Sequence, residues 1–205
     1  MSTFIDLLRH GETASKFRYC GSTNHPLTPF GWTQMWQAIE NHPTQWQQIV
    51  TSPLARCADF ARVIGLRYTI PVAYDEHIQE IHFGDWEDRS STELMQTDAD
   101  ALVSFWQNPL NHPPPNGEHL LNFEARVLSA WYAIQQQFDG KKVLLVTHSG
   151  VIRIIIRHIL QLSLERMLEL EIKHASIMQI QIDSDQSSQA ILISGLKSQS
   201  EHCSS

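Results

Sequence analysis

The sequence predicts an α/β fold in which helices cover both faces of a mostly parallel sheet, a three-layer α/β/α sandwich. Short apolar segments typical of buried strands alternate along the chain with longer segments whose apolar residues recur every three or four positions. This alternation favours parallel strands joined by crossover helices. A chain of 205 residues, of which 42% are hydrophobic and 18% charged, is long enough to build one sizeable core.

The first half of the chain contains three expected strands separated by two expected helices. The first strand is the apolar run Phe4 to Leu8, which only Asp6 interrupts. Thr28 is a suitable N-cap for the first helix, with Pro29 at the first helical position, and that helix is expected to run to about His42. The remaining elements of this half are a strand at 49–51, a helix at 54–64 and a strand at 69–74.

The middle of the chain, residues 75–115, is less regular and ends in three consecutive prolines, so we expect it to leave the sheet and form a cap over the active site. Short helices are expected near residues 91–96 and 98–106. The later elements are a helix at 118–138 that Gly140 ends, a strand at 143–146, a helix at 151–160 and a closing hairpin of strands 177–182 and 190–194. These expectations describe a single domain over residues 1–195, followed by a polar tail over residues 196–205.

Composition and charge narrow the class of protein. The formal net charge of −7 argues against a nucleic-acid-binding protein, because no basic excess is present to neutralise phosphate backbones. The longest apolar stretch, Val151 to Leu160, contains basic residues and is too short to span a bilayer, and the N-terminus lacks the pattern of a signal peptide. The three cysteines (Cys20, Cys57 and Cys203) form neither a disulfide framework nor a metal motif. We therefore expect a cytoplasmic protein without nucleic-acid or membrane partners.

Charged and imidazole side chains follow several of the expected strands at the point where each strand ends. Arg9 and His10 follow the first strand, Arg56 comes shortly after the second, and His148 follows a later one. Because the carboxyl ends of parallel strands lie on one side of a sheet, we expect these residues to converge. Two arginines and two histidines would form an electropositive pocket suited to a phosphate group.

The same residues predict phosphoryl-transfer chemistry. A neutral imidazole at His10 can attack phosphorus, while the arginines and a protonated His148 stabilise the charge on the transferred group. Glu80 can donate a proton to the leaving alkoxide and later accept one from the attacking water. This mechanism requires no metal ion and no cofactor, and the expected substrate is a small phosphorylated metabolite.

Two alternatives concern the acidic stretch around Glu80. Four other carboxylates crowd this stretch and could serve in its place: Glu76, Asp85, Glu87 and Asp88. His77 and His82, together with Glu76 and Glu80, also have the composition of a metal cluster. Their spacing matches no HExxH motif or comparable ligand pattern, so no metal ligands are predicted.

The motifs around these residues resemble the histidine phosphatase superfamily, the phosphoglycerate-mutase-like group. RHGET at residues 9–13 matches the family signature, SPLARC supplies Arg56, EIHFGDWE contains Glu80 and VTHSGVIR contains His148, in the expected order. The resemblance covers residues 4–194 and implies a phosphoglycerate-mutase-like fold. It also implies that His10 is the phosphorylated nucleophile, that Glu80 is the proton donor, and that the phosphate clamp consists of Arg9, Arg56 and His148.

Further segments are similar to those of α-ribazole phosphatases, which remove the 5′-phosphate of α-ribazole 5′-phosphate in cobalamin nucleotide-loop assembly. These segments are SPLARCADFA, FGDWED, FWQNP, PNGEHLLNFEARV and the aromatic Trp131. Lys16, Thr23 and Asn24 are then predicted to bind substrate, although relatives usually have asparagine in place of Lys16 and aspartate before the PLT segment. Trp86 or Trp106 could stack on a substrate base, with packing in the core or the cap as the simpler interpretation.

Other functions fit the same pattern of residues. Within the superfamily, the alternatives are a phosphoglycerate mutase and a broad-specificity phosphatase. From another class, the alternative is a non-catalytic phosphate-binding module that keeps the pocket without turning substrate over.

Overall fold

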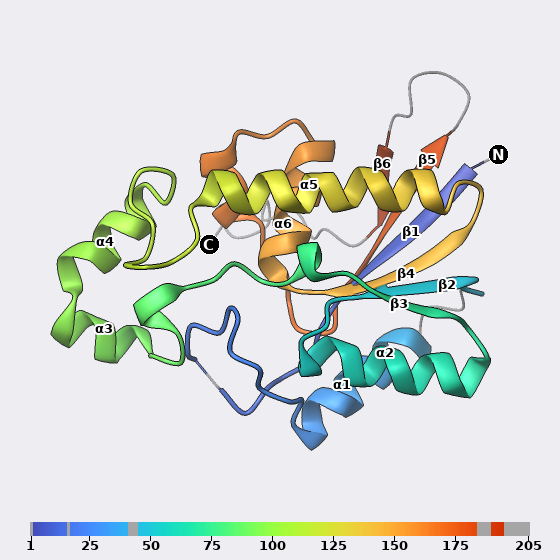
Figure 1. The fold of residues 1–205 in the computed structure, drawn as a ribbon, viewed down its shortest axis with the longest axis horizontal. Coiled ribbons are helices and arrows are strands. Elements are labelled where there is room, and N and C mark those ends of the chain that lie inside the picture. Colours follow the sequence, from blue (N-terminus) through green and yellow to red (C-terminus); the bar gives the residue numbers. More distant parts are fainter. Residues whose placement is uncertain (1, 16, 41–44, 184–189, 195–205) are drawn as a thin grey trace, which may run out of the picture.

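The computed structural model describes residues 2–15, 17–40, 45–183 and 190–194, and its centre is a six-stranded sheet with the order β3-β2-β4-β1-β5-β6 (Figure 1). The strands are β1 (Ser2–Arg9), β2 (Gln48–Thr51), β3 (Val72–Tyr74), β4 (Lys142–Thr147), β5 (Ile177–Asp183) and β6 (Ala190–Ser194). Strands β3, β2, β4 and β1 are parallel to one another, whereas β5 runs antiparallel to both β1 and β6. The mostly parallel sheet and the closing hairpin are therefore confirmed.

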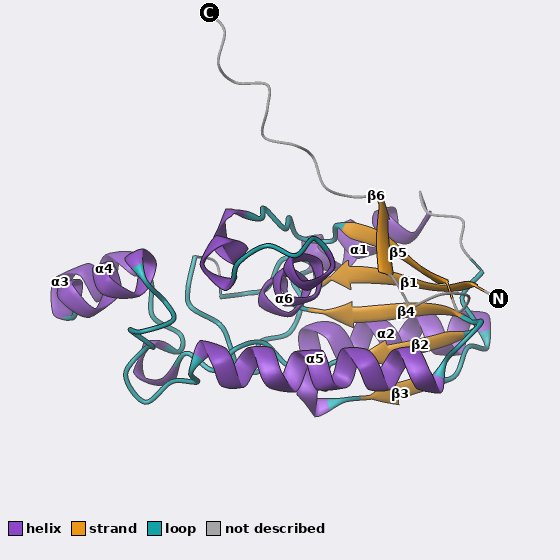
Figure 2. Cartoon of the chain, turned by 90° about the horizontal axis from the view of Figure 1, so that it is seen from above, coloured by secondary structure: helices purple, strands orange, loops and turns teal. Residues whose placement is uncertain are grey.

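Four helices cover the two faces of this sheet. Helices α1 (Pro29–Glu40) and α2 (Ala55–Tyr68) lie against one face, and α5 (Leu120–Gln137) and α6 (Ser149–Ile159) lie against the other (Figures 1 and 2). The three-layer α/β/α sandwich is thus confirmed. Among the helices of the described residues, none combines the length and the apolar composition needed to cross a membrane.

The apolar run of β1 is explained by its burial between two helical layers. Ile5 and Leu7 belong to the hydrophobic cluster that contains α5 and α6, whereas Leu8 belongs to the cluster that contains α1 and α2. All three side chains have no exposed surface. A strand whose alternate side chains meet helices on both faces must be apolar throughout, which is why β1 shows no polar alternation.

Asp6 is the polar exception in this strand, and the structure shows how it is accommodated. The residue is 1% exposed. Its carboxylate accepts hydrogen bonds from the indole Nε1 of Trp46 at 2.7 Å and from Nε2 of Gln179 at 3.0 Å. A buried carboxylate is costly unless its oxygens are hydrogen-bonded, so Trp46 and Gln179 make this position tolerable.

The first turn of α1 packs directly on the loop that follows β1. Thr28 caps the helix as expected, because its Oγ1 accepts a hydrogen bond from the backbone N–H of Gly31 at 3.0 Å. A Cβ atom added to Gly11 would lie 2.3 Å from the carbonyl oxygen of Gly31, and this backbone contact excludes any side chain there. The close approach fixes the loop after His10 against α1.

Two elements differ from the expectation. The strand predicted at residues 69–74 begins only at Val72, because Thr69 takes a left-handed conformation (φ 57°) and ends α2. Its N–H donates to the carbonyl of Gly65. A further 3₁₀ helix, η3 (Leu164–Glu169), lies between α6 and β5 and was not predicted.

The cap predicted over residues 75–115 contains the two short helices that were expected, α3 (Ser91–Thr97) and α4 (Ala99–Gln107), after two 3₁₀ turns, η1 (Glu76–Ile78) and η2 (Gly84–Trp86). Helices α3 and α4 extend to one side of the sandwich (Figure 2). A small hydrophobic cluster of its own supports them: Tyr19, Trp86, Leu94, Leu102 and Phe105. The single domain over residues 1–195 stays a prediction, and the polar tail over residues 196–205 lies outside the described residues.

Replacing Trp46 with phenylalanine removes the indole N–H that donates to the buried carboxylate of Asp6. We expect Trp46→Phe to lower the free energy of unfolding by about 1–3 kcal/mol, measured by urea denaturation. Trp32→Phe is the matched control, since the ring of Trp32 packs on Phe60 in the neighbouring helical layer. Equal losses in the two variants would show that ring volume, not the hydrogen bond, stabilises this position.

Candidate active site

The parallel pairing of β1 and β4 brings the two predicted histidines together. Arg9 at the end of β1 lies opposite Thr147 at the end of β4, so the next residues of both strands, His10 and His148, leave the sheet side by side. Their ring centroids are 5.3 Å apart, with the ring planes at 61°. The expected convergence at the carboxyl edge of the sheet is therefore present.

His10 is held as a neutral imidazole with one ring nitrogen unoccupied. It is 7% exposed, and its Nδ1 lies 2.8 Å from the carbonyl oxygen of Gly11. A carbonyl can only accept, so Nδ1 carries the proton and Nε2 keeps its lone pair. Burial, together with the charges of Arg9 and Arg56, holds the pKa of His10 well below its usual value of 6.5. Such an imidazole can act as a nucleophile.

His148 is buried beside His10 and also has a lowered pKa. It has no exposed surface; Arg56 Nε donates to its Nδ1 at 3.1 Å, and its Nε2 donates to Ser52 Oγ at 2.8 Å. Burial, followed by the charge of Arg56, holds the pKa of His148 well below 6.5. A protonated His148 that stabilises the transferred phosphoryl group stays a prediction.

Arg56 lies behind the cavity and organises the loop before α1. It is 1% exposed, and its terminal nitrogens donate to the carbonyl oxygens of Thr23 at 2.8 Å and Gly21 at 2.7 Å. Neither Arg56 nor His148 is among the residues that line the main cavity. Their direct contact with phosphate stays a prediction, whereas their contact with each other and with the loop is part of the fold.

The side chains of Thr23 and Asn24 are used within the loop. Thr23 Oγ1 donates to the carboxylate of Glu87, and Asn24 Oδ1 accepts from the N–H of Ala55 at 2.7 Å, which satisfies the first turn of α2. Neither residue is among those that line the cavity. We propose for both a role in positioning the loop. The predicted ligand Lys16 lies outside the described residues.

Arg9 faces the cavity with unsatisfied hydrogen-bonding capacity. One of its terminal nitrogens donates to the carbonyl of Ile172 at 2.6 Å, while its Nε is buried and has no hydrogen-bond partner among the described residues. Burial lowers the pKa of Arg9 to about 10, so the guanidinium stays charged at neutral pH. A buried cation with a free donor is suited to an anionic ligand.

Glu80 is held at the N-terminus of α6 by three donors. Its Oε2 accepts from the N–H of Gly150 at 3.0 Å and from Ser149 Oγ at 3.2 Å, and its Oε1 accepts from the N–H of Ile81 at 3.1 Å. A Cβ atom on Gly150 would lie 2.2 Å from Glu80 Oε1, so only glycine permits this approach. Glu80 is 8% exposed and lines the cavity.

The other carboxylates of the acidic stretch point elsewhere. Glu87 accepts from the backbone N–H groups of residues 21–23, Asp85 accepts from Asn116, Asp88 pairs with His25, and Glu76 is exposed. None of the four is among the residues lining the main cavity. Of the alternatives open in the sequence, the geometry therefore favours Glu80. Within the described residues, no group of three or more histidine, cysteine or acidic side chains is arranged to hold a metal ion.

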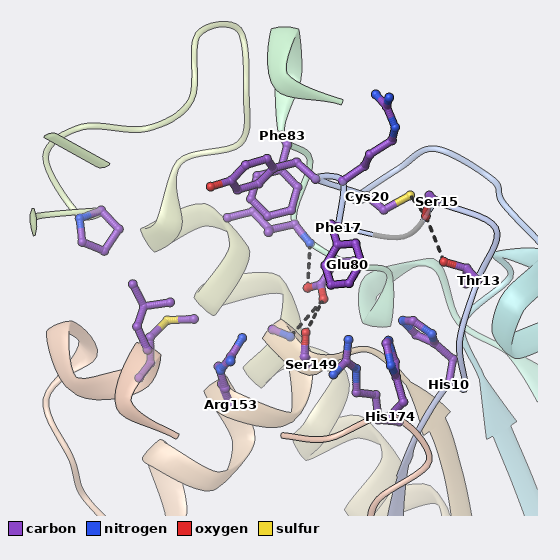
Figure 3. Close-up of a pocket in the computed structure, with 18 of the residues that line it drawn as sticks. His10, Thr13, Ser15, Phe17, Cys20, Glu80, Phe83, Ser149, Arg153 and His174 are labelled. Carbon is purple, nitrogen blue, oxygen red and sulfur yellow. Dashed lines mark hydrogen bonds between the residues drawn. The ribbon is translucent and has the colours of Figure 1, made fainter. Parts of the chain in front are cut away.

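The cavity has a volume of about 610 Å³ and two unlike sides. His10, His174, Arg153, Glu80 and Ser149 form the polar side, and Phe83 lies across from them (Figure 3). The aromatic wall, as we call this opposite side, consists of Tyr19, Phe83, Phe105 and Trp106. Trp86 is not part of it, because it is fully buried and its indole N–H donates to Asp98, so the simpler interpretation of packing under the cap is confirmed for this residue.

Sequence reasoning missed two residues on the polar side, Arg153 and His174. Arg153 lies three residues after Gly150 in α6, and the backbone N–H of Gly150 donates to Glu80. Residues three apart on a helix share one face, so this spacing could have indicated that Arg153 faces the site. The ring of His174 is 5.7 Å from that of His10, and burial lowers its pKa to about 4. His174 comes from the irregular segment before β5, for which no periodic pattern exists.

Comparisons with known proteins agree with this geometry. The sequence model of the histidine phosphatase superfamily (branch 1) matches residues 5–192. The chain is 32% identical over 166 residues to the adenosylcobalamin/alpha-ribazole phosphatase of Escherichia coli (strain K12), covering 78% of this chain and 81% of that one. It is 28% identical over 176 residues to 2,3-bisphosphoglycerate-dependent phosphoglycerate mutase 2 of Gloeobacter violaceus, covering 82% and 80%.

A solved structure is similar over almost the whole chain. The crystal structure of the alpha-ribazole phosphatase from Shigella flexneri superimposes with a TM-score of 0.81 at 28% sequence identity. The match covers 95% of this chain and 96% of that chain. The similarity therefore includes both the sandwich and the cap.

The lowered pKa values of His10 and His148 predict that the protein loses stability as the pH falls below about 6.5. In that range the unfolded chain binds protons that the folded protein does not, so unfolding becomes more favourable. The slope approaches roughly 1.4 kcal/mol per pH unit for each histidine. Urea denaturation at pH 7.5, 6.5 and 5.5 measures it, and His10→Gln is expected to show a shallower slope. A free energy of unfolding that stays constant across this range would contradict the burial of neutral histidines.

Proposed function

Because this chain belongs to the histidine phosphatase superfamily (branch 1) and is a phosphatase, we propose that it removes the 5′-phosphate of α-ribazole 5′-phosphate through a phosphohistidine at His10. The substrate would be a small phosphorylated metabolite of the cytoplasm. Relatives that carry the name alpha-ribazole phosphatase, in sequence and in structure, support this choice.

The observation that carries the substrate proposal is the aromatic wall. Phe105 and Trp106 come from α4 of the cap, and their rings are 5.4 Å apart. Tyr19 contributes its ring from the loop after β1, and its hydroxyl accepts the indole N–H of Trp106 at 2.9 Å. Trp106 remains 51% exposed and so has surface available for a planar ligand. An aromatic base that stacks here would place the phosphate toward the polar side.

In the first half of the proposed reaction, His10 Nε2 attacks the phosphorus atom and the P–O ester bond breaks. The hydrogen bond from Nδ1 to Gly11 keeps Nε2 free and directed away from the backbone. Arg9 offsets the negative charge of the phosphoryl group. Glu80 in its protonated form gives its proton to the leaving alkoxide, so the alcohol departs neutral and Glu80 becomes a carboxylate.

In the second half, water attacks the phosphohistidine on the side that the alcohol has left. Glu80 takes the proton from this water, the N–P bond breaks, and inorganic phosphate is released with neutral His10 restored. One carboxyl group therefore serves as acid and then as base, and its hydrogen bonds to Ser149 and Gly150 hold it at one position in both steps.

The proton-transfer role predicts that Glu80→Gln slows hydrolysis according to the leaving group. We expect kcat/KM, which reports the step in which the alcohol leaves, to fall by about 100-fold or more for alkyl phosphates, whose alkoxides need a proton, and much less for p-nitrophenyl phosphate. Steady-state rates over a series of leaving groups measure this dependence. His10→Ala is the control, since it removes the nucleophile and is expected to abolish both activities and the acid-labile phosphate on the protein. Equal slowing for all leaving groups would assign the proton to another residue.

The substrate proposal is tested by a panel of α-ribazole 5′-phosphate, phosphoserine, 3-phosphoglycerate and p-nitrophenyl phosphate. We expect the highest kcat/KM with α-ribazole 5′-phosphate, and a loss of about 10-fold with that substrate in Trp106→Ala, the size of one lost stacking contact. Leu121→Ala is the control, because Leu121 is also exposed but is not among the residues that line the cavity. Preference for phosphoglycerate, or transfer of its phosphate to another position, would favour a mutase. Binding without turnover of any ester would indicate a non-catalytic module.

A further inference from the structure

Arg153 is a cation in the cavity that the proposed reaction does not use. It lies on the first turns of α6, it is half-buried, and its Nε donates to the carbonyl of Leu170 at 2.9 Å. Its two terminal nitrogens have no hydrogen-bond partner among the described residues, and the guanidinium points into the cavity (Figure 3). A desolvated guanidinium with free donors is expected to bind an oxygen acceptor.

The backbone holds Arg153 in place for such a contact. Leu170 and Ile172 are two residues apart in one segment, and their carbonyl oxygens accept from Arg153 and from Arg9, respectively. Burial lowers the pKa of Arg153, while the charge of Glu80 opposes this effect because the carboxylate lies close to the guanidinium. Arg9 and Arg153 therefore line the same cavity, and each is held in place by its own backbone carbonyl.

The position of Arg153 relative to the reacting groups indicates which part of the substrate it meets. His10 and His174 lie at one end of the polar side and Arg153 at the other, with Glu80 and Ser149 between them (Figure 3). In the proposed reaction the phosphoryl group is at His10 and the ester oxygen is at Glu80. The region beyond Glu80, where Arg153 lies, must therefore receive the alcohol portion of the substrate.

We propose that Arg153 is a specificity-determining residue that binds an oxygen acceptor of the alcohol portion, close to the ester oxygen. This inference rests on the proposed function, in which the acceptor is a ring or hydroxyl oxygen of a ribose 5-phosphate unit. A carboxylate next to the phosphate, as in a phosphoglycerate, offers the same acceptor chemistry to the planar donor fork.

The test compares the wild-type enzyme with Arg153→Met and Arg153→Lys on ribose 5-phosphate, α-ribazole 5′-phosphate, 3-phosphoglycerate and p-nitrophenyl phosphate. For esters that carry the acceptor, we expect Arg153→Met to lower kcat/KM by about 10- to 100-fold, as for one lost charged hydrogen bond. For p-nitrophenyl phosphate, which has no such acceptor, the change stays within about 3-fold. Arg153→Lys is expected to lose less activity than Arg153→Met, because lysine keeps the positive charge but lacks the planar pair of guanidinium donors. Arg62→Met, an exposed residue of α2, is the control for the same change in net charge.

The pattern of kcat/KM losses over the four esters shows which part of the substrate Arg153 contacts. A loss confined to the ribose esters supports the proposal with a sugar oxygen as acceptor, and a loss confined to 3-phosphoglycerate supports it with a carboxylate. An equal loss on all four esters, p-nitrophenyl phosphate included, overturns the proposal, since Arg153 would then act on the phosphoryl group or through Glu80. No loss on any ester also overturns it. If the wild-type enzyme leaves α-ribazole 5′-phosphate intact, the proposed substrate fails, while ribose 5-phosphate and 3-phosphoglycerate still test Arg153.

Discussion

The parallel pairing of β1 with β4 is the constraint on which the whole site depends. Arg9 opposite Thr147 fixes His10 beside His148, and a shift of β1 by one residue would place its side chains on the opposite faces relative to β4. The pairing is itself secured by burial on both faces, because the apolar side chains of β1 pack on two separate helical layers. Hydrophobic burial of one strand therefore determines the position of His10, the proposed nucleophile.

The three arginines near this pair of histidines, Arg9, Arg56 and Arg153, differ in the partners that they already have within the protein. Arg56 is buried and donates to His148 and to loop carbonyls, so its charge is already partly satisfied within the protein. Together with burial it keeps both imidazoles neutral before substrate arrives. Arg9 and Arg153 instead retain free donors toward the cavity. Arg56 therefore acts within the fold, Arg153 faces the cavity, and Arg9 both lines the cavity and helps to lower the pKa of His10.

The sequence was sufficient to predict the elements and the residues that follow strands, because strand ends in a parallel sheet converge by geometry. It could not separate Glu80 from its acidic neighbours, since that choice depends on which carboxylate reaches the N-terminus of α6 past Gly150. His174 was missed for a related reason: it lies on an irregular segment whose position comes from tertiary contacts, such as the N–H of Ala175 donating to the carbonyl of His10. The side chains of Thr23 and Asn24 bind Glu87 and the N–H of Ala55 rather than the cavity, and no local sequence pattern identifies these distant partners.

The two sides of the cavity belong to different parts of the fold, and this division has a consequence for specificity. The polar side takes His10 from the end of β1 and Ser149 and Arg153 from α6, with Glu80 and His174 added from irregular segments, whereas Phe105 and Tyr19 belong to the small cluster under the cap. Phe83 packs against both the small cluster and the cluster of α5 and α6, and so joins the two sides. Substitutions in the wall of the cap can therefore alter the recognised alcohol without moving His10 or Glu80. Arg153 is the exception in our proposal, because it would bind the alcohol from the side of the cavity that also holds Glu80.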